Sequence, residues 1–383
     1  MKLSILELRH LKLPLVNFFE TSFGRVYDHE TVLVILHTRP DRVGDREGFI
    51  GYGEAPASAF PYYSSETVET CWYILKNFLT PLLTRKFTDS QGQMDNLNIL
   101  LSSFSRIRGH QMAKAAVEFA LSDLQAQAKG YSLSHLYGGT KKTIPAGISL
   151  GIDISLTQLM RQINTAIQTG YQRIKIKIKP GWDIITIKEI RSVFPDIALS
   201  VDANGAYTSD DWKLFKELDK YKLLMIEQPL AYNDLMDHAA LQKKIKTPIC
   251  LDESITSFHA AEQALALKSC RIINIKPARV GGPSEAKKIH DLCLQKKIPV
   301  WCGGLLETGI GRLHNIAIAS LPGFKLPNDI SASERYYQED IITPPVSVEK
   351  NGFIKVPEEP GLAKRVDLGR VEKYTIKKEI IML

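Results

Sequence analysis

The hydrophobic residues in the central part of the chain form short strand-like runs that alternate with helical stretches. From Thr143 onward the predicted strands are 144–149, 172–178, 197–202, 223–227, 248–252, 271–276 and 299–303, with 325–330 as a candidate closing strand. Helical patterns intervene, for example at 157–169 and 284–296. A strand, a helix and two short loops repeated in this way are typical of a (β/α) barrel of the α/β class.

The first 130 residues lack this repeat. They contain β-rich runs at 2–16, 31–39 and 49–56, and then amphipathic helical patterns. Ser64 is a candidate N-cap of the first helix, and Gly130 ends a helix predicted over 111–129. We therefore expect an α+β capping domain over 1–130, a barrel over 131–335, and a C-terminal return to the cap over 336–383.

Five predicted strands end in a charged residue, and these residues are spaced almost evenly along the chain. The intervals are 25, 25, 25 and 24 residues, for Lys177, Asp202, Glu227, Asp252 and Lys276. The C-terminal ends of barrel strands gather at one mouth, where barrel enzymes carry their chemistry. The spacing therefore predicts a reaction centre built from two lysines and three carboxylates.

The three carboxylates indicate a metal site. Side by side they would repel one another and raise each other's pKa unless a cation lies between them. Oxygen ligands from separate strand ends suit Mg²⁺, for which Mn²⁺ can substitute, whereas zinc is not expected without His or Cys at these positions. A single strand-end Asp is more often a helix cap or a surface charge, but three at equal pitch favour the metal. Asn204 and Gln228 are candidate hydrogen-bond donors around the ligands.

The segment 173–179 alternates basic residues with isoleucines, so in a strand all its basic side chains share one face. Alone, this pattern is more often a solvated surface strand. In a barrel, however, the isoleucines pack under helices and the lysines face the lumen, where ammonium groups need opposite charge. We expect Lys175 and the metal to lower the pKa of Lys177 enough for it to act as a base, with Lys276 across the lumen. This arrangement suits proton abstraction from a carbon next to a carboxylate.

Composition narrows the function classes. The chain has 383 residues, a net charge of +7, and apolar and charged fractions of 44% and 24%, which are ordinary for a soluble enzyme. We find no concentrated basic patch with interleaved aromatics for nucleic acid, and no apolar run near the roughly 20 residues of a membrane span. The five cysteines form no CxxC pair and are expected to be reduced in the cytoplasm. The expected partner is a small-molecule carboxylate, and the chain is expected to form a homo-oligomer.

The same residues resemble the enolase superfamily, in its muconate-lactonizing subgroup with a Lys-x-Lys pair. The resemblance is closer still to the branch of o-succinylbenzoate synthases and N-succinylamino acid racemases. The stretches that carry it are 51–56, 174–183, 276–282 and 301–309. It implies a (β/α)7β barrel, a modified TIM barrel, under an α+β cap. It also implies that Lys177 is the general base with Lys175 as its partner, that Asp202, Glu227 and Asp252 bind Mg²⁺, and that Lys276 acts on the opposite face.

Two activities of this branch fit the chain, and the sequence leaves both open. One is dehydration of a cyclohexadiene carboxylate to o-succinylbenzoate in menaquinone synthesis, and the other is racemisation of N-succinylamino acids. A mandelate racemase would have a histidine in place of Lys276, and a dipeptide epimerase would have a second acid after Asp329. A metal-independent Schiff-base enzyme and a catalytically silent scaffold leave the evenly spaced carboxylates unexplained.

The resemblance also implies substrate contacts. Ser149 and the predicted loop Phe18–Gly24, with Phe19 and Ser22, would contact the succinyl portion; core packing and an ordinary surface loop are the alternatives. Further substrate-binding candidates are Arg279, Gly304 and Leu305. An arginine at the position of Arg279 occurs in racemising members, although an exposed arginine in a salt bridge is an equally simple account.

Overall fold

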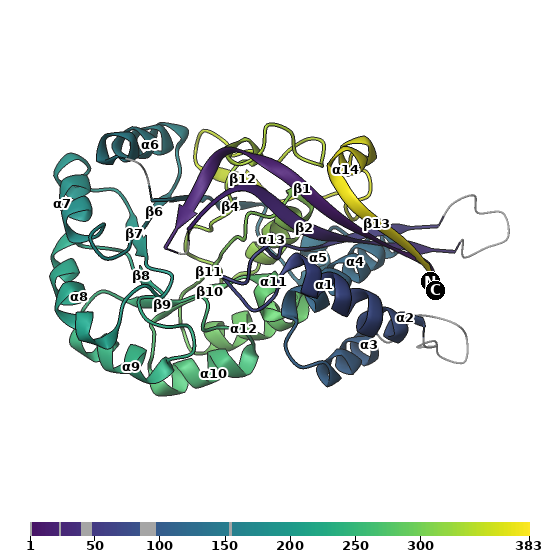
Figure 1. The fold of residues 1–383 in the computed structure, drawn as a ribbon, viewed down its shortest axis with the longest axis horizontal. Coiled ribbons are helices and arrows are strands. Elements are labelled where there is room, and N and C mark those ends of the chain that lie inside the picture. Colours follow the sequence, from purple (N-terminus) through teal and green to yellow (C-terminus); the bar gives the residue numbers. More distant parts are fainter. Residues whose placement is uncertain (1, 23, 40–47, 85–96, 153–154) are drawn as a thin grey trace.

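The computed structural model describes residues 2–22, 24–39, 48–84, 97–152 and 155–383. A curled sheet ringed by helices packs against a second part built on long antiparallel strands (Figure 1). Within these residues, the curled sheet has seven parallel strands in sequence order. They are β5 (Gly147–Leu150), β6 (Arg173–Lys177), β7 (Leu199–Asp202), β8 (Ile226–Glu227), β9 (Ile249–Leu251), β10 (Ile272–Ile275) and β11 (Val300–Cys302).

Helices follow the strands on the outside of this sheet (Figure 1). Their buried apolar residues belong to the same hydrophobic core as the strands, as Leu159 and Ile163 of the first helix do. The predicted barrel and all seven of its parallel strands are thereby confirmed. The helices are α6 (Leu156–Thr169), α7 (Ile184–Val193), α8 (Trp212–Leu218), α9 (Leu235–Lys244), α10 (Phe258–Leu267), α11 (Pro277–Val280), α12 (Pro283–Gln295) and α13 (Gly309–Ala319).

The candidate closing strand at 325–330 does not form a regular strand. Two isolated parallel bridges replace it, joining Phe324 to Val300 and Asn328 to Ala146. Pro327 lies between the two bridges and has no N–H to donate, which interrupts a ladder at this point. The segment nevertheless spans the gap between β11 and β5, because Asp329 N donates to Cys302 O at 2.9 Å and Gly147 N donates to Asn328 O at 2.6 Å.

The cap sheet, as far as the structure describes it, has four antiparallel strands in the order β13–β1–β2–β3. The last strand of the chain pairs with the first in an antiparallel manner, so the N- and C-termini lie side by side at one end of the sheet (Figure 1). Before reaching the cap, the C-terminal segment pairs β12 with β4, the short strand that precedes β5. The strands are β1 (Leu3–Thr21), β2 (Gly24–Thr38), β3 (Ile50–Ala55), β4 (Thr143–Pro145), β12 (Phe353–Lys355) and β13 (Thr375–Met382).

Helix α4 (Gln111–Lys129) packs on the cap sheet and ends where it was predicted to end, with Gly130 in the left-handed conformation at φ 68°. It can approach β3 closely because a Cβ on Gly53 would lie 2.0 Å from Ala116 O. The remaining helices are α1 (Val68–Ile74), α2 (Thr80–Thr84), α3 (Leu97–Ser103), α5 (Leu133–Tyr137) and α14 (Leu368–Tyr374). Short π or 3₁₀ segments are η1 (Leu75–Leu79), η2 (Phe104–Arg106), η3 (Ser209–Asp211), η4 (Asp219–Tyr221) and η5 (Ser333–Arg335).

Two local predictions in the cap are wrong. Ser64 does not cap α1; Thr67 does, in a reciprocal capping box with Thr70. The predicted loop Phe18–Gly24 belongs mostly to a long hairpin, in which β1 and β2 pair out to Thr21 and Gly24. The hairpin tip reaches the barrel, where Ile152 N donates to Glu20 O at 3.1 Å. None of the described helices is both long and apolar enough to cross a membrane.

Candidate active site

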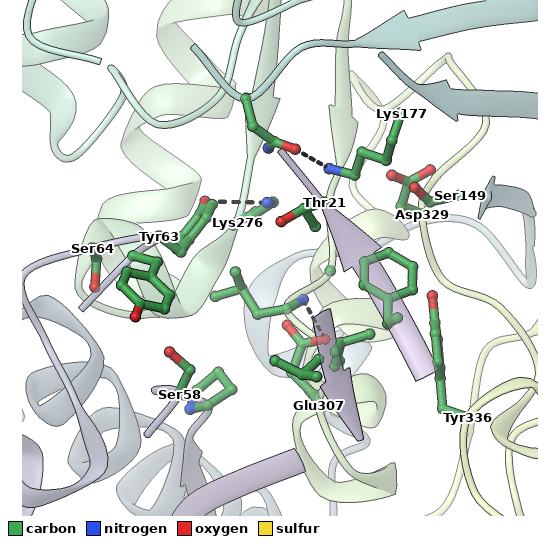
Figure 2. A pocket seen from close by; sticks show the side chains of 18 of the residues that line it. Thr21, Ser58, Tyr63, Ser64, Ser149, Lys177, Lys276, Glu307, Asp329 and Tyr336 are labelled. Carbon is green, nitrogen blue, oxygen red and sulfur yellow. Dashed lines mark hydrogen bonds between the residues drawn. The ribbon is translucent and has the colours of Figure 1, made fainter. Parts of the chain in front are cut away.

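A cavity of about 470 Å³ lies between the C-terminal ends of the barrel strands and the cap. The β1–β2 hairpin tip and the cap loop over residues 56–66 form part of its wall. Figure 2 shows the side chains of Lys177 and Lys276 directed toward this shared space from the barrel. Charged side chains at the strand ends and a covering domain together make a site that can exclude water.

The three predicted ligands come together at the barrel mouth. Asp202 ends β7, Glu227 ends β8 and Asp252 follows β9, and all three are fully buried. One oxygen of each carboxylate lies within 4.8 Å of the others. The parallel register produces this arrangement, because it pairs Asp202 with Glu227 on the neighbouring strand.

These carboxylates fit a divalent cation that prefers oxygen ligands. Burial raises the pKa of Glu227, and the neighbouring Asp202 raises it further. A cation held between them would relieve both effects. Because the ligands are oxygen atoms from three separate strands, the geometry favours a hard ion over zinc.

Each carboxylate of the trio accepts a hydrogen bond from a lysine. Lys177 Nζ donates to Asp202 Oδ2 at 2.6 Å, and Lys276 Nζ donates to Asp252 Oδ2 at 2.8 Å. Lys175 Nζ donates to Glu227 Oε2 at 2.8 Å. The alternation in the sequence therefore places the lysines in the lumen, as predicted.

The charges stabilise one another despite burial. Burial alone would lower the pKa of Lys175, but Asp329 and Glu227 raise it well above its usual range. Burial also opposes charge on Lys276, whose pKa is raised by Tyr63 and Glu227. Burial disfavours the carboxylate of Asp202, yet the ammonium groups of Lys177 and Lys175 hold its pKa far below the usual value. Lys175 and Lys276 therefore remain cationic.

The two predicted amides lie at the site, but their side chains do not donate to the trio. Asn204 accepts a hydrogen bond from Lys177 Nζ at 2.8 Å, while its own amide donates to Glu253 Oε1. Gln228 Oε1 accepts from the backbone N–H of Asp252 at 3.0 Å and so fixes the end of the strand.

Asn274 supplies the side-chain donor that sequence analysis missed. Its Nδ2 donates to Glu227 Oε1 at 2.8 Å. It precedes Lys276 by two residues, so the strand alternation carried a signal for it. Gly303 makes room for this contact, because a Cβ there would lie 2.3 Å from Asn274 Oδ1 and 2.8 Å from Lys276 Cε.

Asp329 is a second functional residue that sequence analysis missed. Its carboxylate contacts Lys175 Nζ at 2.5 Å and also pairs with Arg173, whose guanidinium lies 4.0 Å above the Trp301 ring. The sequence drew attention to Asp329 only as an incomplete epimerase motif. Its position depends on the irregular closing segment, which has no periodic signal.

Arg279 does not line the cavity, although its predicted role in substrate binding requires it to. It is 4% exposed and is not among the described residues that line the cavity. Its guanidinium pairs with Asp252 and donates to the backbone oxygens of Ile255 and Asn274. The structure thus places Arg279 behind a metal-ligand candidate, and the exposed salt bridge considered as an alternative is wrong.

Tyr63, from the cap, connects the cap to this cluster. Its hydroxyl donates to Asp252 Oδ1 at 2.9 Å and accepts from Lys276 Nζ at 3.1 Å. Since Tyr63 lies in a loop without a regular pattern, this contact could not be predicted from the sequence.

Four of the predicted substrate contacts line the cavity: Phe19, Ser149, Gly304 and Leu305. Ser149 Oγ is buried and has no hydrogen-bond partner among the described residues, so it is available to a ligand. Ser22 does not belong to the described cavity lining, although its neighbours Thr21 and Gly24 do. Ser22 lies in the turn of the hairpin.

Comparison with known families agrees with this fold and site. Residues 158–370 match the family described as Enolase C-terminal domain-like, and residues 8–138 match the Mandelate racemase / muconate lactonizing enzyme, N-terminal domain. The chain therefore belongs to the enolase superfamily, as its motifs predicted.

Within that superfamily the chain is similar to o-succinylbenzoate synthases and N-succinylamino acid racemases. It is 50% identical to an o-succinylbenzoate synthase of Geobacillus kaustophilus, over 96% of this chain and 94% of that protein. It is 41% identical to an N-succinylamino acid racemase of Thermus thermophilus, over 98% of each chain. An enolase-superfamily crystal structure from Listeria innocua superposes with a TM-score of 0.90 at 42% identity, covering 100% of this chain and 99% of that one. The resemblance to this branch is thereby confirmed.

Proposed function

We propose that this protein is an o-succinylbenzoate synthase, which dehydrates 2-succinyl-6-hydroxy-2,4-cyclohexadiene-1-carboxylate during menaquinone biosynthesis. The observation that carries the proposal is the pair Lys177 and Lys276, which reach one cavity beside a trio of carboxylates. Their strands, β6 and β10, are separated by three others in the sheet. A planar substrate between them would have one amine on each face.

Asp202, Glu227 and Asp252 would hold Mg²⁺, with Mn²⁺ as a substitute. An ion held there would supply Lewis acidity toward the substrate carboxylate. The support is the set of three buried oxygen donors within 4.8 Å of one another.

Lys177 serves as the base. Its amine removes the proton from the ring carbon that bears the carboxylate. The carbon–oxygen bond at the neighbouring carbon then breaks, and the same amine returns the proton to the departing hydroxyl, which leaves as water. Because one amine performs both transfers, the elimination is syn.

Lys276 serves as a cation on the opposite face. The pKa of Lys276 is raised, although burial opposes its charge, so it holds its proton while negative charge develops on the substrate. Its ammonium also lies over the π system of the ring that becomes aromatic.

Ser149 and Phe19 would contact the succinyl portion, and Gly304 and Leu305 would line the opposing wall. The unpartnered hydroxyl of Ser149 and the apolar ring of Phe19 both face the cavity, which supports this assignment. Arg279 would act by holding Asp252, not by touching substrate.

The second candidate is an N-succinylamino acid racemase, either in place of the synthase or in the same site. The same two lysines would act as donor and acceptor on opposite faces of the α-carbon. The racemase relative from Thermus thermophilus supports this alternative.

The experiment that tests the proposal compares kcat/KM for the cyclohexadiene carboxylate and for a panel of N-succinylamino acids in Mg²⁺. We expect efficient dehydration with racemisation at or below it. A dehydration value thousands of times below racemisation would make the racemase the main activity. We also propose that the protein is cytoplasmic and forms a homo-oligomer. Light scattering coupled to gel filtration tests the oligomeric state directly.

A further inference from the structure

Arg312, on α13, differs from the other cationic residues that line the cavity. Among the described lining residues, the other cations each have a carboxylate partner: Arg25 with Glu20, Lys175 with Asp329, Lys177 with Asp202, and Lys276 with Asp252. Within the same set, no carboxylate pairs with Arg312. A positive charge in this cavity therefore lacks a counter-ion within the described protein.

The guanidinium of Arg312 is buried, with 3% of the residue exposed. Among the described residues its one hydrogen bond runs from Nη1 to the backbone oxygen of Ser331 at 3.3 Å. Nη2 is buried and has no partner among the residues that the structure describes. An unpaired buried charge costs folding free energy, so a residue in this state is suited to receive an anion.

Neighbouring groups hold Arg312 without neutralising it. Its guanidinium carbon lies 5.0 Å from the ring centre of Tyr336 and 5.6 Å from that of Tyr337. The nearby cavity carboxylate, Glu307, already accepts hydrogen bonds from Leu305 N at 2.8 Å and Asn315 Nδ2 at 2.9 Å. The aromatic rings thus fix the direction of the guanidinium while leaving its charge available.

The proposed substrate carries two carboxylates, and the metal and lysines account for only the one attached to the reacting carbon. We propose that Arg312 binds the distal carboxylate, at the end of the succinyl arm, and makes the enzyme specific for succinylated substrates. This inference rests on the proposed function and applies equally to dehydration and racemisation, because both substrate types carry the same arm.

The test measures binding of o-succinylbenzoate and of its analogue with the distal carboxylate converted to a primary amide. Titration calorimetry in Mg²⁺ gives both dissociation constants. A charge-assisted contact predicts that the wild-type protein binds the acid on the order of 10- to 100-fold more tightly than the amide. In R312M we expect this acid-to-amide ratio to fall to about one, because binding of the acid weakens while binding of the amide is retained.

R25M is the matched control, because Arg25 lines the same cavity but is paired with Glu20 at 2.7 Å. Its acid-to-amide ratio should stay within about threefold of wild type. If R312M does not fold, R312K replaces it; a single ammonium cannot reproduce the planar fork, so the ratio should still fall severalfold.

A wild-type ratio near one, or an unchanged ratio in a folded Arg312 variant, overturns the inference even if dehydration proceeds normally. A wild-type protein that neither binds o-succinylbenzoate nor forms it overturns the proposed function and this inference together. These outcomes separate a failure of the arginine assignment from a failure of the assigned reaction.

Discussion

Lys177 and Lys276 reach one cavity from strands separated by three others, and each donates to a different carboxylate of the same trio, at 2.6 and 2.8 Å. A substrate whose carboxylate binds a cation held by this trio would therefore have an amine available on each side. The two lysines are not equivalent, because Asn204 is a second partner of Lys177, whereas Tyr63 and Asp252 surround Lys276.

We predict that K276A reduces racemisation of N-succinylamino acids by at least about a thousandfold, since one of the two proton-transfer groups is lost. Dehydration should also fall severely. Lys177 remains in the variant, so exchange of the α-proton with D₂O should persist for one enantiomer, which proton NMR detects. K296A, at an exposed position of the barrel surface, is the control. Full retention of both rates in K276A would refute the assigned role of Lys276.

Removing the metal should abolish both activities, and adding Mg²⁺ should restore them. Because the trio is buried, Mg²⁺ should also raise the melting temperature of the chelated protein by binding only the folded state. In E227Q, Mg²⁺ should restore less activity and should raise the melting temperature less than in wild type. The substitution removes one ligand charge and the partner of Lys175. E262Q, at a residue with an exposed side chain, should behave as wild type. Unchanged activity in EDTA would contradict the metal-dependent mechanism.

Y63F should weaken Mg²⁺ binding about tenfold, because groups that orient a metal ligand affect affinity at this level. The substitution removes the O–H that donates to Asp252 and the oxygen that accepts from Lys276. Calorimetric titration with Mg²⁺ measures the effect, and Y73F, at an exposed tyrosine of the cap, is the matched control. Equal Mg²⁺ affinity in Y63F and Y73F would show that the cap does not tune the metal site.

The stability of the protein should depend on pH through Glu118 on α4. Burial raises the pKa of Glu118 to about 7, although Ser284 donates a hydrogen bond to it. The folded state therefore favours the protonated carboxyl. The contribution of the Glu118 carboxyl to stability is complete below about pH 4.3, the ordinary pKa of a glutamate. This contribution is lost as the pH rises through about 7.

E118Q keeps an oxygen that can accept from Ser284 and carries no charge. Denaturant unfolding should therefore show a smaller fall in the free energy of unfolding between about pH 5 and pH 7 than in wild type. Over that interval, the free energy of unfolding of E118Q should rise relative to that of wild type by on the order of 2 kcal/mol. Parallel pH profiles for the two proteins would show that Glu118 does not titrate in this range.

The barrel and the group of acids and lysines at its mouth could be predicted from the sequence, because both follow the regular strand–helix repeat. Each of Asp202, Glu227, Asp252 and Lys276 ends or follows a strand, so the repeat fixes both their place in the fold and their common mouth. The alternation around Lys175 and Lys177 likewise determines which side chains face the lumen.

The rest of the site comes from segments without a period. Asp329 depends on the irregular closing segment, Tyr63 on a cap loop, and Arg312 on a buried helix whose contacts are tertiary. The hairpin tip was predicted as a loop because Ser22 and Gly24 favour turns locally, whereas pairing of the two strands decides the outcome. Arg279 lies too near Lys276 in sequence for spacing alone to show that it turns away from the cavity.

The most direct test of the central claim is a crystal structure of the protein with Mg²⁺ and o-succinylbenzoate. The account predicts one ion bound by Asp202, Glu227 and Asp252, with the aromatic carboxylate beside it and the amines of Lys177 and Lys276 on opposite faces of the ring. An ion bound elsewhere, or both lysines on the same face of the ring, would contradict it.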